Sequence, residues 1–125
     1  MKIATIIVRV LLGLLFVFGA VAYFGNLFPP PELSGAMKVF NDGLEASVYI
    51  MPVVKTVELI CGVALILNRF VPLATVVIFP IVVNIVGVHV FLAPDGLPVA
   101  LFVLFATLFL VFVHRDRYAE LLASR

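Results

Sequence analysis

Four long apolar segments constrain this chain more than any other feature of its sequence. Each has roughly 17–23 residues, and an α-helix needs about 20 to cross the hydrocarbon core of a bilayer. Hydrophobic residues make up 65% of the 125 residues and charged residues 12%, whereas soluble domains are about 45–50% apolar and 25% charged. The sequence therefore predicts an all-α, polytopic membrane protein with one domain over residues 1–125. The expected spans are residues 3–24, 48–67, 70–92 and 97–113.

Turn signals separate these segments. Pro29-Pro30-Pro31 follows the first, Asn68-Arg69 separates the second from the third, and Pro94-Asp95-Gly96 separates the third from the fourth. The last two connections are too short for anything other than hairpins. We therefore expect an antiparallel bundle of four transmembrane helices.

Basic residues gather in segments that an even number of spans places on one side of the membrane. Six of the eight Lys and Arg residues lie at the N-terminal end, in the Asn68-Arg69 turn and in the C-terminal tail. Cytoplasmic segments are enriched in Lys and Arg, so both termini are predicted to be cytoplasmic. Lys2, the apolar run and Ala20-Val21-Ala22 also match a cleaved signal peptide, but Arg9 interrupts the apolar region and favours a retained helix.

The loop after the first span carries an amphipathic segment over residues 33–47. Its apolar residues recur at spacings of three and four, which predicts a short helix at the outer interface. They are Leu33, Met37, Phe40, Leu44 and Val48. Two roles remain open for this segment, a solvated linker helix or a lid over a site in the bundle.

Ionisable side chains within a span cost about 2.5–3.5 kcal/mol each and are rarely without a role. Lys55 and Glu58 lie three residues apart in the second span, so they share a helix face and can pair. Asn84 in the third span falls at the depth of Lys55, and it can accept from Lys55 or donate to Glu58. These residues are either structural contacts between helices or a binding site for a substrate, a proton or a lipid headgroup.

Other polar residues lie in the outer halves of the spans, where they predict a cavity open toward the outer leaflet. Tyr23 and Asn26 are at the outer end of the first span. His89 in the third span lies about 140° round the helix from Asn84, so the two need not face one cavity. Arg9, in contrast, is interpreted as an anchor whose side chain extends to the inner interface.

Composition also excludes several classes of function. The net charge of +1, without a basic patch, argues against nucleic acid as a partner. The single cysteine, Cys61, excludes an internal disulfide and a C-x-x-C redox pair. His89 has no second ligand on its helix face, so no metal site is expected. The sequence shows no catalytic centre and no intrinsic cofactor.

Polar landmarks at fixed spacing resemble those of the DoxX family. They are Lys55-x-x-Glu58-Leu59 with Gly62, then Asn68-Arg69-Phe70-Val71-Pro72, then Pro80-x-x-Val83-Asn84-Ile85-x-x-x-His89. The family consists of small four-helix membrane proteins of bacteria and archaea. It is named after a subunit associated with terminal quinol oxidase and thiosulfate:quinone oxidoreductase activity. In the family a Lys or Asn follows the glycine of the first span, whereas Tyr23 or Asn26 stands there in this chain. The family also has a carboxylate in the fourth span, about where this chain has Thr107.

The resemblance implies a quinone- or lipid-binding accessory subunit of a membrane redox system, in the cytoplasmic membrane of a bacterium. Its expected partners are membrane lipid, a quinone or other isoprenoid lipid, and a redox protein that supplies electrons. Two alternatives remain, a small proton-coupled transporter that uses Glu58 and a non-catalytic scaffold or assembly protein. Small multidrug exporters rely on Trp, which is absent here. The oligomeric state is left open.

Overall fold

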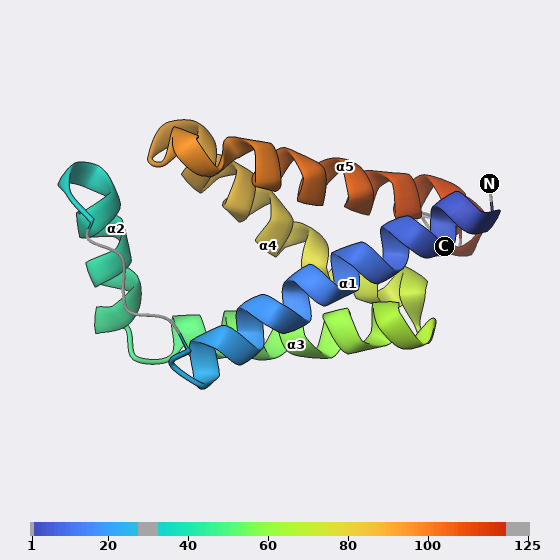
Figure 1. Ribbon diagram of the computed structural model, residues 1–125, viewed down its shortest axis with the longest axis horizontal. Helices are drawn as coiled ribbons and strands as arrows, with labels where there is room; N and C mark the ends of the chain where they lie inside the picture. Colours follow the sequence, from blue (N-terminus) through green and yellow to red (C-terminus); the bar gives the residue numbers. More distant parts are fainter. Residues whose placement is uncertain (1, 28–32, 120–125) are drawn as a thin grey trace.

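The computed structural model describes residues 2–27 and 33–119, which form helices joined by short turns (Figure 1). The elements are α1 (Lys2–Phe24), α2 (Gly35–Ala46), α3 (Ile50–Leu67), α4 (Val71–Phe91), η1 (Pro94–Gly96), α5 (Leu97–Val113) and η2 (Arg115–Tyr118). Within these residues, four helical segments are long and apolar enough to cross a membrane, namely α1, α3, α4 and η1 with α5. The predicted all-α bundle with four spans is confirmed, and the predicted span ends differ from the helix ends by at most two residues.

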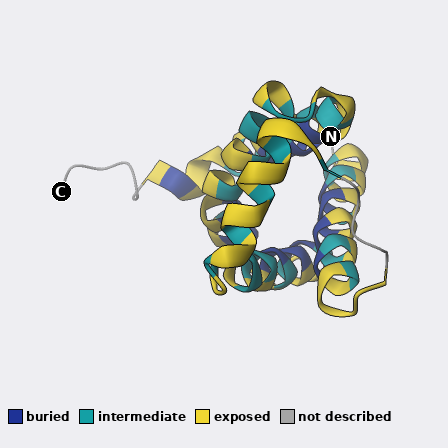
Figure 2. Cartoon of the chain, turned by 90° about the vertical axis from the view of Figure 1, so that its left-hand side faces the viewer, coloured by how far each residue is buried: buried dark blue, intermediate teal, exposed yellow. Residues whose placement is uncertain are grey.

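The four spanning helices form a closed ring in the order α1, α3, α4, α5, because each packs against the next and α5 packs against α1. The start of α1, the α3–α4 turn and η2 lie at one end, here called the terminal end (Figure 1). α2 and η1 lie at the opposite end, here called the α2 end. Buried residues face the inside of the ring, and exposed residues face outward (Figure 2). Only 22–28% of each span is buried, so most of its apolar surface is left for lipid.

A close contact between α1 and α3 joins Gly13 to Gly62. A Cβ atom on Gly62 would lie 2.9 Å from the carbonyl oxygen of Gly13 and 2.8 Å from Cγ2 of Val17. A Cβ atom on Gly13 would lie 2.8 Å from the carbonyl oxygen of Gly62. Small residues allow membrane helices to approach this closely.

The turn between α3 and α4 begins at Asn68, whose backbone is left-handed with φ 57° and ψ 44°. The N–H of Arg69 donates to the carbonyl of Ala64 (2.9 Å), and the N–H of Asn68 donates to that of Leu65 (3.3 Å). This is the Schellman pattern of a helix C-terminus. Asn adopts the left-handed conformation more readily than most residues, so the predicted break falls where the chain can make it at low cost.

The side chain of Arg9, predicted to be an interfacial anchor, faces α3 and is bound at the end of that helix. The residue is only 8% exposed, and its guanidinium group donates to the carbonyls of Leu65 and Ile66, the latter at 3.2 Å. Those carbonyls belong to the last turn of α3, where a helix lacks its own donors and carries partial negative charge. Inside lipid such carbonyls need a partner within the protein, and the α1–α3 contact brings Arg9 within reach.

α3 and α4 meet at the terminal end and diverge toward the α2 end, where α2 lies across the opening (Figures 1 and 2). α2 packs against α3 and contains no buried residue. Ser47 joins the two helices, because its hydroxyl donates to the carbonyl of Leu44 (2.6 Å) and accepts from the N–H of Ile50 (3.2 Å). The predicted amphipathic segment 33–47 therefore contains a helix, and this helix covers the wide end of the bundle.

The glycine contact gives a first testable prediction. Gly62→Ala should lower the free energy of unfolding by about 1–3 kcal/mol, because the added methyl overpacks the α1–α3 contact. Gly87→Ala in α4 is the matched control, since no atom outside its chain neighbours and the backbone of α4 lies within 4 Å of the position of a Cβ atom there. Unfolding would be followed by circular dichroism during titration from a mild detergent into SDS. Equal losses in the two variants would contradict the close contact.

Candidate functional site

The polar residues predicted in the second and third spans line one cavity at the α2 end. The cavity lies between α2, α3 and α4 and has a volume of about 470 Å³, a size common for small-molecule sites. Its polar lining residues are Asn41, Lys55, Glu58, Asn84 and His89. Its apolar lining residues are Met37, Phe40, Leu44, Ile50, Met51, Val54, Ile81, Ile85 and Val88.

Lys55 and Glu58 form the predicted ion pair, with Nζ 3.2 Å from Oε2. The side chain of Glu58 is 6% exposed and that of Lys55 is 22% exposed, so the carboxylate is the more deeply buried partner. On the other side of Lys55, a Cβ atom on Gly19 would lie 3.9 Å from Nζ. The ammonium group therefore lies close to Gly19 of α1.

Asn84 does not tie α4 to α3 as predicted. Its Nδ2 donates to the carbonyl of Pro80 (3.0 Å), one turn earlier in the same helix. No hydrogen bond joins Asn84 to Lys55 or Glu58 within the described ranges, because α3 and α4 have diverged here and the cavity separates them. An amide group has two N–H donors and a carbonyl acceptor, so Asn84 keeps one donor and its oxygen for another partner.

His89 lines the same cavity as Asn84, although the two side chains leave α4 about 140° apart. Nδ1 of His89 is 2.7 Å from the carbonyl oxygen of Ile85. A carbonyl can only accept, so Nδ1 carries the proton, and Nε2 of the neutral ring is an acceptor. The ring lies against Gly96 of η1, where a Cβ atom would be 2.4 Å from Cδ2. Gly96 thus makes room for the imidazole.

The other two candidates lie outside the cavity. Tyr23 and Asn26 are exposed. The ring of Tyr23 packs edge to face on Phe24, with centroids 5.3 Å apart, and Asn26 follows the end of α1 with a φ of 49°. α1 packs on α3 and α5 and contributes no residue to the cavity lining. Tyr23 and Asn26 therefore lie apart from the four candidate residues that line the cavity.

Sequence reasoning missed two contributors to the site. Asn41 was not among the candidate residues, but it follows Phe40 at the edge of the apolar stripe and lines the cavity. Gly96 acts only by leaving space for His89, which a sequence does not reveal until the neighbouring side chain is known. Among the residues that the structure describes, no three His, Cys, Asp or Glu side chains are close enough together to hold a metal ion.

Comparison with protein families matches residues 4–93 of the chain to DoxX. The match covers more than two thirds of the sequence. The chain belongs to the DoxX family. The matched segment includes α1 from residue 4 and all of α3 and α4, together with the four cavity residues Lys55, Glu58, Asn84 and His89. Searches among curated proteins and among solved structures gave no match.

The cavity of this DoxX protein can hold a molecule that has both a polar head and an apolar body. Lys55 offers N–H donors, Asn84 offers a donor and an acceptor, and Glu58 and Nε2 of His89 offer acceptors. The remaining walls are aliphatic side chains, Met residues and one Phe. This combination of a few convergent polar groups with apolar walls is typical of small-molecule sites.

The ion pair of this DoxX protein can be tested with a double-mutant cycle. Lys55→Met should lower the free energy of unfolding by about 3–5 kcal/mol, because it strands the buried Glu58 carboxylate. Glu58→Leu should cost less, since Lys55 is partly exposed, and the double variant should cost less than Lys55→Met alone. SDS titration measures each value.

The matched control is the exposed pair on α2, Lys38 and Asp42, whose atoms Nζ and Oδ2 are 2.9 Å apart with side chains 59% and 57% exposed. Its cycle should give a coupling of only about 0.3–0.5 kcal/mol. Additive losses at Lys55 and Glu58 would show that the two residues do not interact and would separate their roles.

Proposed function

We propose that this DoxX protein binds a quinone or a lipid with a polar head in the cavity between α2, α3 and α4, as an accessory subunit of a membrane redox system. The observation that carries the proposal is that Lys55, Glu58, Asn84 and His89 all line one cavity with apolar walls. Lys55, Glu58 and Asn84 lie inside helices that are apolar enough to span a membrane, more than one turn from either helix end. His89 is near the end of α4.

A quinone ring fits the chemistry of this lining. Its two carbonyl oxygens need one donor each, and Lys55 Nζ and the second N–H of Asn84 can supply them from opposite walls. The reduced form carries hydroxyl groups, which Glu58 and Nε2 of His89 can accept. Reduction of a quinone takes up two electrons and two protons. We assign the electrons to a partner oxidoreductase and the contacts that orient the ring to this chain.

The proposal includes an orientation in the cytoplasmic membrane of a bacterium with both termini in the cytoplasm. It is supported by the basic residues of the α3–α4 turn and of η2, Arg69, Arg115 and Arg117, which lie at the terminal end (Figure 1). Cytoplasmic segments carry an excess of such residues. In this orientation the cavity opens in the outer half of the bilayer, and α2 covers it at the outer surface.

The close packing of the terminal half favours binding over passage through the bundle. Leu12, Leu65 and Leu110 are fully buried there, and Gly13 and Gly62 bring α1 and α3 into backbone contact. A transporter would have to open this half as well as the α2 end. The scaffold alternative has no need for polar groups that face a cavity.

Binding of a decyl-chain ubiquinone analogue tests the proposal. Asn84→Leu should weaken binding about 5–10-fold, because one hydrogen bond to the ligand is worth about 1 kcal/mol. The dissociation constant would be measured by calorimetry on the purified full chain in detergent. Asn26→Gly is the control, because it removes an amide group outside the cavity at a left-handed position that glycine also adopts, and it should leave binding unchanged.

Two results would count against this function. The first is a purified sample that carries neither quinone nor lipid by mass spectrometry and does not bind the analogue. The second is equal weakening by Asn84→Leu and Asn26→Gly, which would place the ligand elsewhere on the protein.

A further inference from the structure

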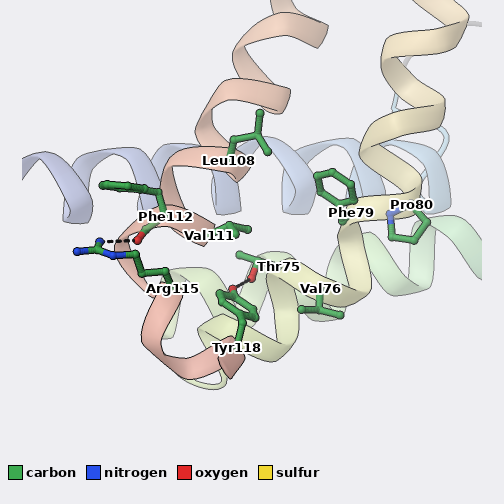
Figure 3. Close-up of a pocket in the computed structure, with 9 residues that line it drawn as sticks. All are labelled: Thr75, Val76, Phe79, Pro80, Leu108, Val111, Phe112, Arg115 and Tyr118. Carbon is green, nitrogen blue, oxygen red and sulfur yellow. Dashed lines mark hydrogen bonds between the residues drawn. The ribbon is translucent and has the colours of Figure 1, made fainter. Parts of the chain in front are cut away.

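A second hollow lies at the terminal end, on the lipid-facing side of α4 and α5. This groove has a volume of about 590 Å³. Its walls are Val76, Phe79 and Pro80 from α4 and Leu108, Val111 and Phe112 from α5 (Figure 3). Several of these side chains are exposed, with Phe112 at 58% and Val76 at 43%, so the groove opens to the surroundings of the bundle.

The floor of the groove is closed by a pair of hydroxyl groups that satisfy each other. Tyr118 of η2 reaches back to Thr75 of α4 and forms a buried hydrogen bond with it (Figure 3). Thr75 Oγ1 donates to the carbonyl of Pro72 (2.8 Å), so the Tyr118 hydroxyl is the donor of the pair. With both hydroxyls engaged, the groove presents hydrocarbon and suits an acyl chain better than a polar group.

One charged group lies on the lining, and it has no carboxylate partner among the described residues. The guanidinium group of Arg115 stacks over the Phe112 ring, 4.6 Å from its centroid, and Nη1 donates to the carbonyl of Phe112 (3.0 Å). A guanidinium group has five N–H donors, so most of the donors of Arg115 remain for a phosphate. Phosphate groups bind Arg strongly through paired hydrogen bonds.

We infer that this groove is a binding site for one anionic phospholipid. An acyl chain lies between α4 and α5, and the headgroup phosphate is held by Arg115 at the end of the groove. Leu108 to Arg115 spans about 10 Å along the helix axis, so the groove is long enough to hold the part of an acyl chain next to the headgroup. Arg115 is at the terminal end, where an acyl chain that enters from the headgroup region would begin. The site is separate from the cavity that contains Lys55 and Glu58, so either proposal can fail without the other.

The test compares two lipids that have the same chains and different headgroups. Dioleoyl phosphatidylglycerol and dioleoyl phosphatidylcholine would be titrated onto the purified full chain in detergent, and bound lipid would be counted by native mass spectrometry. The wild type should bind phosphatidylglycerol about fivefold more tightly, since one basic residue near an anionic headgroup contributes about 1 kcal/mol. Arg115→Gln should abolish this preference.

The matched control is Arg69→Gln, which removes the same charge at the same end but away from the groove, and it should keep the preference. Val76→Phe fills the groove and should weaken binding of both lipids. Leu108→Phe fills it from the other wall and serves if Val76→Phe does not fold.

Three outcomes would overturn the proposal. If Arg69→Gln lowers the preference as much as Arg115→Gln, the effect is general surface charge. If the groove-filling variants bind both lipids normally, the chains lie elsewhere. If those variants instead abolish self-association and leave lipid binding intact, the groove is a contact between copies of this chain.

Discussion

The backbone contact of α1 with α3 at Gly13 and Gly62 is the interaction on which the rest of the structure depends. In lipid no hydrophobic effect drives helices together, so close packing and internal hydrogen bonds have to do so. The two glycines permit a contact at van der Waals limits, and that contact places Arg9 at the last turn of α3. The terminal half of the ring is thereby fixed. α3 and α4 are then free to diverge toward the other end, where the divergence leaves the cavity.

The sequence predicted the spans well, because their length and apolar composition are set by the bilayer and are read locally. It also predicted the break at Asn68, which depends on the conformational range of that residue. It could not predict which helix neighbours which, since helices that are apolar all round carry no stripe that marks a partner. For the same reason it could not predict the partners of Arg9. The carbonyls of Leu65 and Ile66, which accept from its guanidinium group, are distant in sequence and become neighbours only when α1 packs on α3.

The site was predicted in part, and the division has a physical basis. Lys55 and Glu58 pair through the three-residue spacing of a single helix, so their contact could be inferred from sequence. Asn84 was expected to reach across to α3, but the separation of the two helices leaves it bonded to Pro80 in its own helix. Tyr23 and Asn26 lie at the same end of the bundle as the site but do not line it. Depth follows from counting residues along a helix, whereas direction depends on how the helices pack.

The covering helix has a further consequence for the kinetics of any molecule held beneath it. α2 has no buried residue and packs chiefly against α3, so its displacement exposes little apolar surface and breaks none of the contacts of the ring. Local opening of this kind is governed by a free energy smaller than that of global unfolding. The residence time of any molecule in the cavity would therefore depend on α2 and the short connection at Ser47, while the lifetime of the fold is set by the four spanning helices. Substitutions in α2 can therefore change the rate at which a molecule enters or leaves the cavity without changing the stability of the four-helix ring.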